Sequence, residues 1–263
     1  MDFEFKQSYS VEDLIRIVAM LRAPGGCPWD IEQTHESIRS NFIEEAYEAA
    51  EAIDTGDKAL LCEELGDVLL QVVFHCQMER EIGSFDLDQV ADGICKKLIL
   101  RHPHVFGEVI AETSAEVLRN WDSIKQKSKG QKSQTQAMEG ISSALPALMR
   151  SQKIQQKAAK VGFDWTDISG AVEKLDEEVL ELKQAISSGD TAHAQEELGD
   201  VLFSAVNAAR FLGCDAEGTL EAANKKFIRR FALVEQAAKE AGLDMSSASL
   251  KELDALWEKA KEV

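Results

Sequence analysis

The sequence has few residues that break helices and no pattern typical of strands. Only four of its 263 residues are proline, whereas Ala, Leu, Glu and Lys are abundant. Proline is the strongest breaker of a helix interior, so long stretches of the chain are free to be helical. No sustained alternation of apolar and polar residues competes with the helical patterns. The scarcity predicts a mostly α-helical protein, long enough for one large domain or for two smaller ones that each bury a core.

The chain also lacks a pattern of paired cysteines, a secretion signal and a long apolar run. Its five cysteines are scattered, without a Cys-x-x-Cys pair, which is typical of a reduced, cytoplasmic protein. The first ten residues, MDFEFKQSYS, contain neither the basic nor the apolar region of a signal peptide. No run approaches the roughly 18 apolar residues that a membrane span needs. We therefore expect a cytoplasmic protein with no membrane partner.

Positive charge is scarce as well, and so are several motifs of nucleotide and metal enzymes. The chain has 29 Lys and Arg against 47 Asp and Glu, a net charge of −18. Binding along a nucleic-acid backbone needs a basic face, so we expect no nucleic-acid partner, although phosphates could still bind locally. The absence of a G-x-x-x-x-G-K-[ST] motif excludes a P-loop hydrolase. A ferritin-like di-iron site needs two Glu-x-x-His motifs, but only Glu32 to His35 matches.

What the sequence does contain is a long internal repeat. The stretch EELGDVL occurs at 63–69 and again at 196–202, an offset of 133 residues. The same offset relates other acids and one turn: Glu44, Glu45 and Glu48 to Glu177, Glu178 and Glu181, and Gly56-Asp57 to Gly189-Asp190. The polar segment 128–146 between the copies has the composition of a linker. We predict an internal duplication, with domains at 1–127 and 147–263.

Each copy predicts two helices joined by a tight turn. Apolar residues at 61, 65, 68, 69, 72 and 73 recur at spacings of three and four, which predicts one buried stripe. Asp57 and Asp190 follow a glycine and are expected to cap the second helix of each pair. The expected helices are 36–54, 57–80, 86–99, 114–126, 170–187, 190–212, 215–240 and 249–261. The fold class is therefore all-α, with two helical bundles in tandem.

The repeated acids predict a metal site in each copy. Residues three apart share a helix face, so antiparallel helices can bring two acid pairs together. The pairs are Glu45/Glu48 with Glu64/Asp67, and Glu178/Glu181 with Glu197/Asp200. Four facing carboxylates repel one another, and an all-oxygen site favours Mg²⁺, with Mn²⁺ as a second candidate. The alternative is a pair of solvated helix faces, which a duplication of the same spacing makes less attractive.

A glycine separates the members of the second acid pair in each copy. Gly66 and Gly199 lie in the middle of predicted helices, where glycine costs about 1 kcal/mol relative to alanine. We expect a neighbouring helix or a ligand to approach closely at these two positions.

Basic residues follow the acids in the second half. The segment ANKKFIRRF (223–231) places Asn224, Lys226 and Arg230 near one helical face, and Lys97 and Arg101 repeat the spacing in the first half. An ordinary exposed basic helix would have the same pattern. Together with the acids, the pattern favours an anion bound by a cation and by positive side chains.

These motifs resemble the MazG family of nucleoside triphosphate pyrophosphohydrolases, in the all-α superfamily of NTP pyrophosphatases. The resemblance lies in E-x-x-E, then 15 residues, then E-x-x-D, and in GCPWD (26–30), RHPHVF (101–106), VGFDW (161–165) and ANKKFIRRF. It covers nearly the whole chain and is closest to two-domain bacterial members. It implies a homodimer that hydrolyses nucleoside triphosphates to nucleoside monophosphates and pyrophosphate with Mg²⁺.

The resemblance also implies roles for individual residues of the second half. The expected Mg²⁺ ligands are Glu178, Glu181, Glu197 and Asp200. Glu177, beside Glu178, would hold or deprotonate the attacking water. The nucleotide-binding set is Lys174, Glu196, Asn224, Lys226, Arg230 and Trp257. Trp257 would stack on the base, although a tryptophan of the core has the same sequence signature.

The first half keeps its acids but loses phosphate-binding groups. Asn41 stands where the second half has Lys174, and Cys95 where it has Asn224. We therefore expect Glu45, Glu48, Glu64 and Asp67 to form a second, weaker site and the C-terminal domain to be the main catalyst. The competing hypothesis is a non-catalytic acidic helical module that senses a nucleotide or binds a protein.

Overall fold

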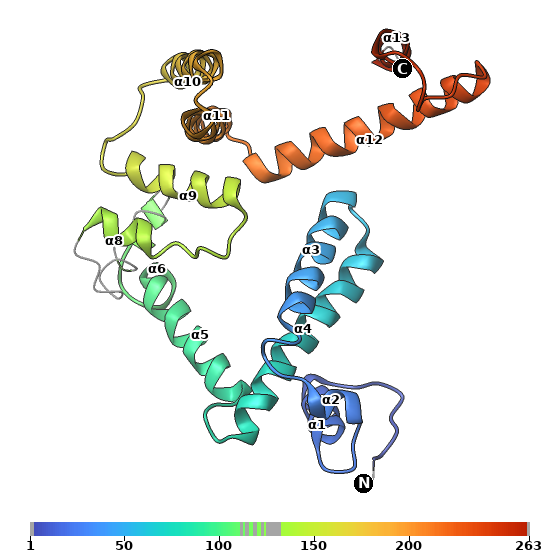
Figure 1. Ribbon diagram of the computed structural model, residues 1–263. Coiled ribbons are helices and arrows are strands. Elements are labelled where there is room, and N and C mark those ends of the chain that lie inside the picture. Colours follow the sequence, from blue (N-terminus) through green and yellow to red (C-terminus); the bar gives the residue numbers. More distant parts are fainter. Residues whose placement is uncertain are drawn as a thin grey trace. The chain divides into compact units, whose positions relative to one another are not determined.

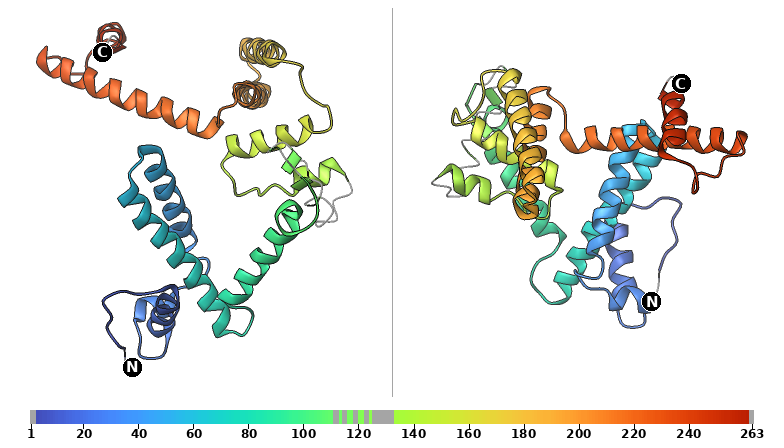
Figure 2. Two further views of the ribbon diagram at one scale, coloured as in Figure 1. Left: turned by 180° about the vertical axis from the view of Figure 1, so that it is seen from behind. Right: turned by 45° about the horizontal axis from the view of Figure 1, so that its top comes forward.

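The structure is a computed structural model that describes residues 3–110, 113, 116, 117, 120, 121, 124 and 133–261. It divides the chain into two units, Met1–Lys125 and Gln126–Val263, which are treated separately below (Figures 1 and 2). Every element of the described residues is a helix, so the all-α fold class is confirmed. Among the described helices, none combines the length and the apolar character needed to cross a membrane.

The first unit contains six described helices. They are α1 (Val11–Arg22), α2 (Pro28–Glu32), α3 (Arg39–Thr55), α4 (Lys58–Glu81), α5 (Leu87–Arg101) and α6 (Pro103–Phe106). The second unit contains six more. They are α8 (Gln134–Glu139), α9 (Ala147–Ala159), α10 (Ile168–Ser188), α11 (Thr191–Phe211), α12 (Ala216–Glu240) and α13 (Leu250–Lys261).

Seven of the eight expected helices are confirmed within about three residues at each end, and they are α3, α4, α5, α10, α11, α12 and α13. Most of the eighth, at 114–126, lies outside the described residues. The helices α1, α2, α6, α8 and α9 were not expected, and α8 lies inside the segment predicted to be a linker. The structural division falls two residues before that linker. The bounds of the functional domains stay a prediction.

The two units use the same turn to join their main helices. Gly56 and Gly189 adopt φ values of 70° and 74°, in the left-handed region that suits glycine at a helix end. Asp57 Oδ1 then accepts hydrogen bonds from the backbone N–H groups of Ala59 (2.9 Å) and Leu60 (3.1 Å). Asp190 Oδ1 accepts one from His193 N at 3.1 Å. The predicted caps are confirmed, and α3 pairs with α4 as α10 pairs with α11 (Figure 1).

The core of the first unit lies where α1 crosses α4. Val18 of α1 packs with Val73, Phe74 and Met78 of α4 and with Ile38, which precedes α3. Ser10 and Asp13 form a capping box that starts α1: Ser10 Oγ accepts from Asp13 N, and Asp13 Oδ2 accepts from Ser10 N. The core therefore supports the second half of α4, while the first half pairs with α3.

The predicted apolar stripe on α4 is only partly buried, so that prediction was wrong in part. Val73 is buried, but Leu65 and Leu69 are 53% and 36% exposed. The reason is that α3 and α1 cover only part of the α4 surface within the described first unit. The uncovered part is an apolar strip on the hairpin.

In the second unit, α9 joins the α10–α11 hairpin to α12. It packs on α11 and α12, and α12 packs mainly on α13. The Gln152 side chain of α9 fixes the turn between α11 and α12. Its Nε2 donates to Cys214 O at 2.9 Å, and its Oε1 accepts from Ala216 N at 3.1 Å. Buried small residues such as Ala171 and Ala185 allow the two hairpin helices to lie close together.

The expected close approach at Gly66 and Gly199 is not made by another helix. A Cβ atom built on either glycine meets no described atom within 4 Å. The space beside both glycines is therefore open among the described residues. The expectation that a neighbouring helix approaches these glycines was therefore wrong. A ligand is the other expected reason for glycine at these positions.

Two glycines of the second unit should respond in opposite ways to alanine. Gly189→Ala places a side chain at positive φ and should lower the free energy of unfolding by about 1–2 kcal/mol. Gly199→Ala removes a flexible residue from a helix with open space around it and should raise that free energy by about 0.5–1 kcal/mol. Urea unfolding followed by circular dichroism measures both. A loss of stability in Gly199→Ala would show that the helix surface there is already occupied.

Candidate active site

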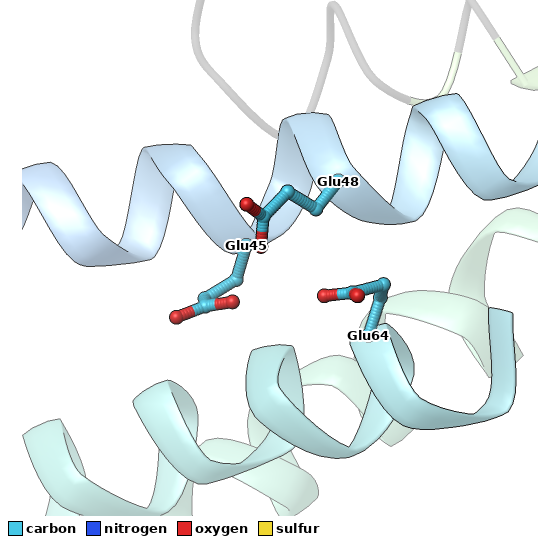
Figure 3. Close-up of side chains that lie close together, drawn as sticks. All are labelled: Glu45, Glu48 and Glu64. Atoms are coloured by element: carbon cyan, nitrogen blue, oxygen red, sulfur yellow. The ribbon is translucent and has the colours of Figure 1, made fainter. Parts of the chain in front are cut away.

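Carboxylates from α3 and α4 meet in the first unit. Glu45 and Glu48 of α3 and Glu64 of α4 offer oxygen atoms that all lie within 4.8 Å of one another. Figure 3 shows the three carboxylates pointing into the space between the two helices. Glu64 is buried, Glu45 is half-buried and Glu48 is exposed. Asp67 is not part of this group, so the structure brings together three of the four predicted acids.

Two acids of the first unit, Glu45 and Glu64, resist ionisation. Burial raises the pKa of Glu45 above its ordinary value, and the charges of Asp67, Glu48 and Glu64 raise it further. Burial likewise raises the pKa of Glu64, with additional repulsion from Glu48, Glu63 and Asp67. No Lys, Arg or His among the described residues forms an ion pair with Glu45, Glu48 or Glu64. The group therefore has an uncompensated negative charge.

The second unit also brings three carboxylates together, although Asp200 joins this group whereas the matching Asp67 is outside the first one. Glu178 of α10 and Glu197 and Asp200 of α11 offer oxygens within 4.8 Å of one another. Glu178 and Glu197 are only 6% and 8% exposed, although both are acids. Glu181 lies outside the group, but burial and its contacts with Glu178 and Glu197 raise its pKa. Three of the four predicted ligands thus lie together, and the fourth is their electrostatic neighbour.

Two basic side chains of the hairpin contact the second group of acids. Lys174 Nζ lies 2.8 Å from Glu178 Oε1 and 3.0 Å from Glu177 Oε1. Hydrogen bonds to Glu178 and Glu177 raise the pKa of Lys174 well above its usual range, so the ammonium stays charged. His193 Nδ1 lies 3.4 Å from Glu197 Oε1. In the first unit the matching positions hold Asn41 and Leu60, which supply no charge.

His193 was not singled out from the sequence, although a signal was present. It stands three residues before Glu196 and four before Glu197, the spacings at which helical side chains meet. Its Nδ1 is 4.0 Å from Glu196 Oε2, which places the predicted nucleotide-binding Glu196 at the edge of the group.

The donor set fits a hard divalent cation. All three clustered side chains in each unit present oxygen, which Mg²⁺ and Mn²⁺ prefer. Glu197 Oε2 is buried and has no hydrogen-bond partner among the described residues. A buried carboxylate oxygen without a partner is costly, and a cation would satisfy it. The same residues could therefore hold a metal, with Glu181 close enough to join them.

The remaining predicted residues lie on other helices. Asn224, Lys226 and Arg230 are on α12, where the Asn224 amide donates to Glu221 Oε2 at 3.2 Å. Trp257 of α13 is half-buried, and its ring centroid is 5.0 Å from that of Phe227. No hydrogen bond or ion pair of the described residues connects these four side chains to the acids. Trp257 has a packing contact, and the four nucleotide-binding roles stay predictions.

Comparison with known proteins identifies the family of this chain. A family model described as "MazG nucleotide pyrophosphohydrolase domain" matches residues 33–106 and 168–234. Both matched segments include one helical hairpin with its acids. The chain belongs to the MazG family. Because the MazG model matches twice, the tandem arrangement of two related helical domains is confirmed.

Individual MazG relatives align over nearly the full chain. The "Nucleoside triphosphate pyrophosphohydrolase/pyrophosphatase MazG" of Thermotoga maritima is 45% identical over 250 residues, 95% of each chain. The "Nucleoside triphosphate pyrophosphohydrolase" of Escherichia coli K12 is 45% identical over 256 residues, 95% of this chain and 97% of that one. The "Uncharacterized protein YabN" of Bacillus subtilis is also 45% identical, over 94% of this chain and 50% of its own length.

The acids of the first unit should make the metal-free protein less stable at neutral pH. A carboxyl whose pKa is higher in the folded chain than in the unfolded chain stabilises the fold below its ordinary pKa. That contribution is lost as the pH rises through the raised value. Glu64→Gln mimics the protonated acid, so it should raise the melting temperature in EDTA at neutral pH and change it little at about pH 4. Thermal unfolding followed by circular dichroism gives both values.

The matched control is Glu51→Gln, which removes an exposed carboxylate of α3 outside the group. It should leave the melting temperature nearly unchanged under both conditions. A lower melting temperature for Glu64→Gln in EDTA at neutral pH would contradict the repulsion described above.

Proposed function

We propose that this protein hydrolyses nucleoside triphosphates, or their deoxy forms, to the monophosphate and pyrophosphate, with Mg²⁺ as the cofactor and Mn²⁺ as the second candidate. The observation that carries the proposal is the group of Glu178, Glu197 and Asp200 with Lys174 beside it. The names of relatives that align over 95% of the chain support the same reaction. The second unit is proposed as the main active site and the first as a weaker one.

Metal binding is assigned to the four acids of the second hairpin. Glu178, Glu181, Glu197 and Asp200 would hold the ion through their carboxylate oxygens. When bound, Mg²⁺ neutralises charge on phosphate oxygens and lowers the pKa of coordinated water. The buried, unpaired Glu197 Oε2 supports this assignment, because it has an acceptor position to offer.

Hydrolysis at the α-phosphorus requires a base for the attacking water. Glu177 is proposed to take the proton as the water oxygen bonds to phosphorus and the bond to the bridging oxygen breaks, releasing pyrophosphate. Its side chain is largely exposed and next to Glu178, and Lys174 holds its Oε1 at 3.0 Å. Lys174 itself stays protonated, so it can donate to a phosphate oxygen instead of to Glu178.

Phosphate and base recognition are assigned to groups outside the acids. Asn224, Lys226 and Arg230 would donate to phosphate oxygens, Glu196 would contact the nucleotide at the edge of the site, and Trp257 would stack on the base. A local set of cations is needed because the chain carries a net charge of −18. In the first unit, Asn41 and Cys95 replace two of these groups, which supports a weaker or structural role there.

A homodimer is part of the proposal. Apolar side chains remain exposed on both hairpins of the separate units: Tyr47, Ile53, Leu65, Leu180, Ile186, Leu198 and Leu202. Large apolar side chains that stay exposed favour association with another protein surface. A second copy could cover these side chains and bring a basic helix to the acids. The proposed partners are nucleoside triphosphates and a second copy of the chain, and no nucleic acid or membrane is among them. The proposed location is the cytoplasm.

Product analysis tests the reaction directly. The protein is incubated with each of the eight common ribo- and deoxyribonucleoside triphosphates in Mg²⁺, and the products are separated by anion exchange. We expect monophosphate and pyrophosphate, and no turnover in EDTA. Diphosphate with phosphate would contradict α–β cleavage. Nucleotide binding without turnover would instead support the non-catalytic sensing module.

Substitutions in the two groups should separate their contributions. Glu178→Gln or Glu197→Gln should lower kcat/KM at least about 100-fold, because the metal contributes several kcal/mol and about 1.4 kcal/mol equals a factor of ten. Glu45→Gln with Glu48→Gln should lower it less than about threefold. Glu173→Gln, an exposed acid of α10, is the matched control. The opposite ranking of the two groups would move the main active site to the first unit.

A further inference from the structure

A chain of three titratable side chains joins the segment before α3 to α4 in the first unit. His35 lies between α2 and α3, and His75 and Glu79 lie one turn apart on α4. His35 Nδ1 is 2.7 Å from His75 Nδ1, and His35 Nε2 is 2.6 Å from Glu79 Oε1. The reaction proposed above uses none of these three residues.

The two imidazoles meet edge to edge. Their ring planes differ by only 6°, and their centroids are 4.9 Å apart. The centroids are farther apart than the Nδ1 atoms by nearly the combined radius of two imidazole rings, so each Nδ1 points at the other. A hydrogen bond between His35 and His75 is therefore almost in line, which is the favourable geometry.

The number of protons on the pair decides whether this bond exists. Hydrogen bonds from Ser84 and His35 lower the pKa of Glu79, so its carboxylate is ionised and only accepts. His35 Nε2 then carries a proton, and one further proton lies between the facing Nδ1 atoms. That bond forms when both rings are neutral or when one ring is charged. When both rings are charged, two N–H groups face each other and the bond is lost.

The surroundings of the pair disfavour the second charge. Burial lowers the pKa of His75, and the charge of His35 lowers it further. Among the described residues, Glu79 is the one group that forms an ion pair with either ring. Glu36, next to His35, is exposed and interacts with it through space. The single paired carboxylate can balance one added proton, but not two.

The other helices that pack on α4 supply no further partner to the pair. From α3, the Phe42 ring lies 5.9 Å from the His75 ring, measured between centroids. Arg22 of α1 pairs with Glu81 at 2.9 Å, and Asp86 at the start of α5 acts on the thiol of Cys76. Their charges are thus directed to other groups.

The pair holds a short segment between two independent anchors. Before it, Arg22 Nη1 donates to Gln33 O at 3.2 Å. After it, Ile38 is 4% exposed and belongs to the core. Among the described residues, His35 alone connects residues 34–37 to another helix by a hydrogen bond. Loss of that connection would free residues 34–37 while both anchors stay in place.

We propose that His35 and His75 form a pH-sensitive latch, which fastens residues 34–37 to α4 at neutral pH and releases them when both rings are protonated. The released form binds more protons than the fastened form, so the latch is stable above the ordinary imidazole pKa of about 6.5 and weakens as the pH falls below it. The latch does not depend on the hydrolysis proposed above.

Hydrogen exchange of the full-length protein in EDTA, followed by mass spectrometry of peptides, tests the latch. Protection of residues 33–42, corrected for the intrinsic rate, should fall about tenfold between about pH 7.5 and about pH 5, the effect of one lost hydrogen bond. Protection of residues 70–78, which include the core of α4, should not fall with it. The acids Glu45 and Glu64 cannot cause this loss, because protonation relieves their repulsion.

Variants of His75 separate the titration from the hydrogen bond. His75→Asn keeps a polar atom near the position of Nδ1 but cannot be protonated, so residues 33–42 should stay protected at both pH values. His75→Phe keeps a ring without the bond, so they should exchange quickly at both. The matched control is His193→Asn in the second unit, which should keep the pH response of the unsubstituted protein.

The decisive quantity is the difference in protection between the two pH values. Its loss in both His75 variants, with retention in His193→Asn, supports the latch. The proposal is overturned if the unsubstituted protein shows no difference or if either His75 variant retains it. An equal fall in residues 70–78 also overturns it, because the whole first unit would then be opening.

Discussion

Repulsion among carboxylates that the backbone forces together is the constraint on which both hairpins depend. A glycine at positive φ and an aspartate cap join two helices tightly, so acids on their facing sides have no room to separate. Their oxygens come within 4.8 Å while two or more of the side chains are wholly or partly removed from water. Such an arrangement costs stability unless a cation is present. The geometry is therefore better explained by binding than by folding.

The two units meet this constraint differently. In the second, the ammonium of Lys174 contacts the acids, so the chain itself supplies a positive charge, and the imidazole of His193 lies beside Glu197. In the first, neutral Asn41 and Leu60 stand in the matching places. The acids of the second unit also include two buried side chains, Glu178 and Glu197. The two copies of one framework thus hold a group of acids with a lysine beside it and a group without one.

Much of this arrangement could be predicted from the sequence, because it depends on local rules. The repeated Gly-Asp turn and the helical spacing of the acids predicted both hairpins and three members of each group. The positions of Asp67 and Glu181 could not be predicted, because a shared helix face does not determine how deep a side chain lies. The same limit applies to α12: its basic face follows from spacing, but the helix against which it packs is set by tertiary contacts such as those of Gln152. The short helices before and between the hairpins were missed because their periodic patterns span few turns.

Because the turn is tight, the number of residues between the acids of the two helices can hardly change. One residue added within α3 after Glu48, or within α4 before Glu64, would rotate the acids on either side of it by about 100° relative to each other, so that they would no longer share one space. Substitution at most surface positions leaves the relative rotation of the two sets of acids unchanged, whereas an insertion or deletion within either helix changes it. Duplication of the whole unit preserves this relative rotation. The constant offset of 133 residues from Glu44 to the second acid pair illustrates this. The two halves therefore differ in individual side chains, while the spacing of their acids is the same.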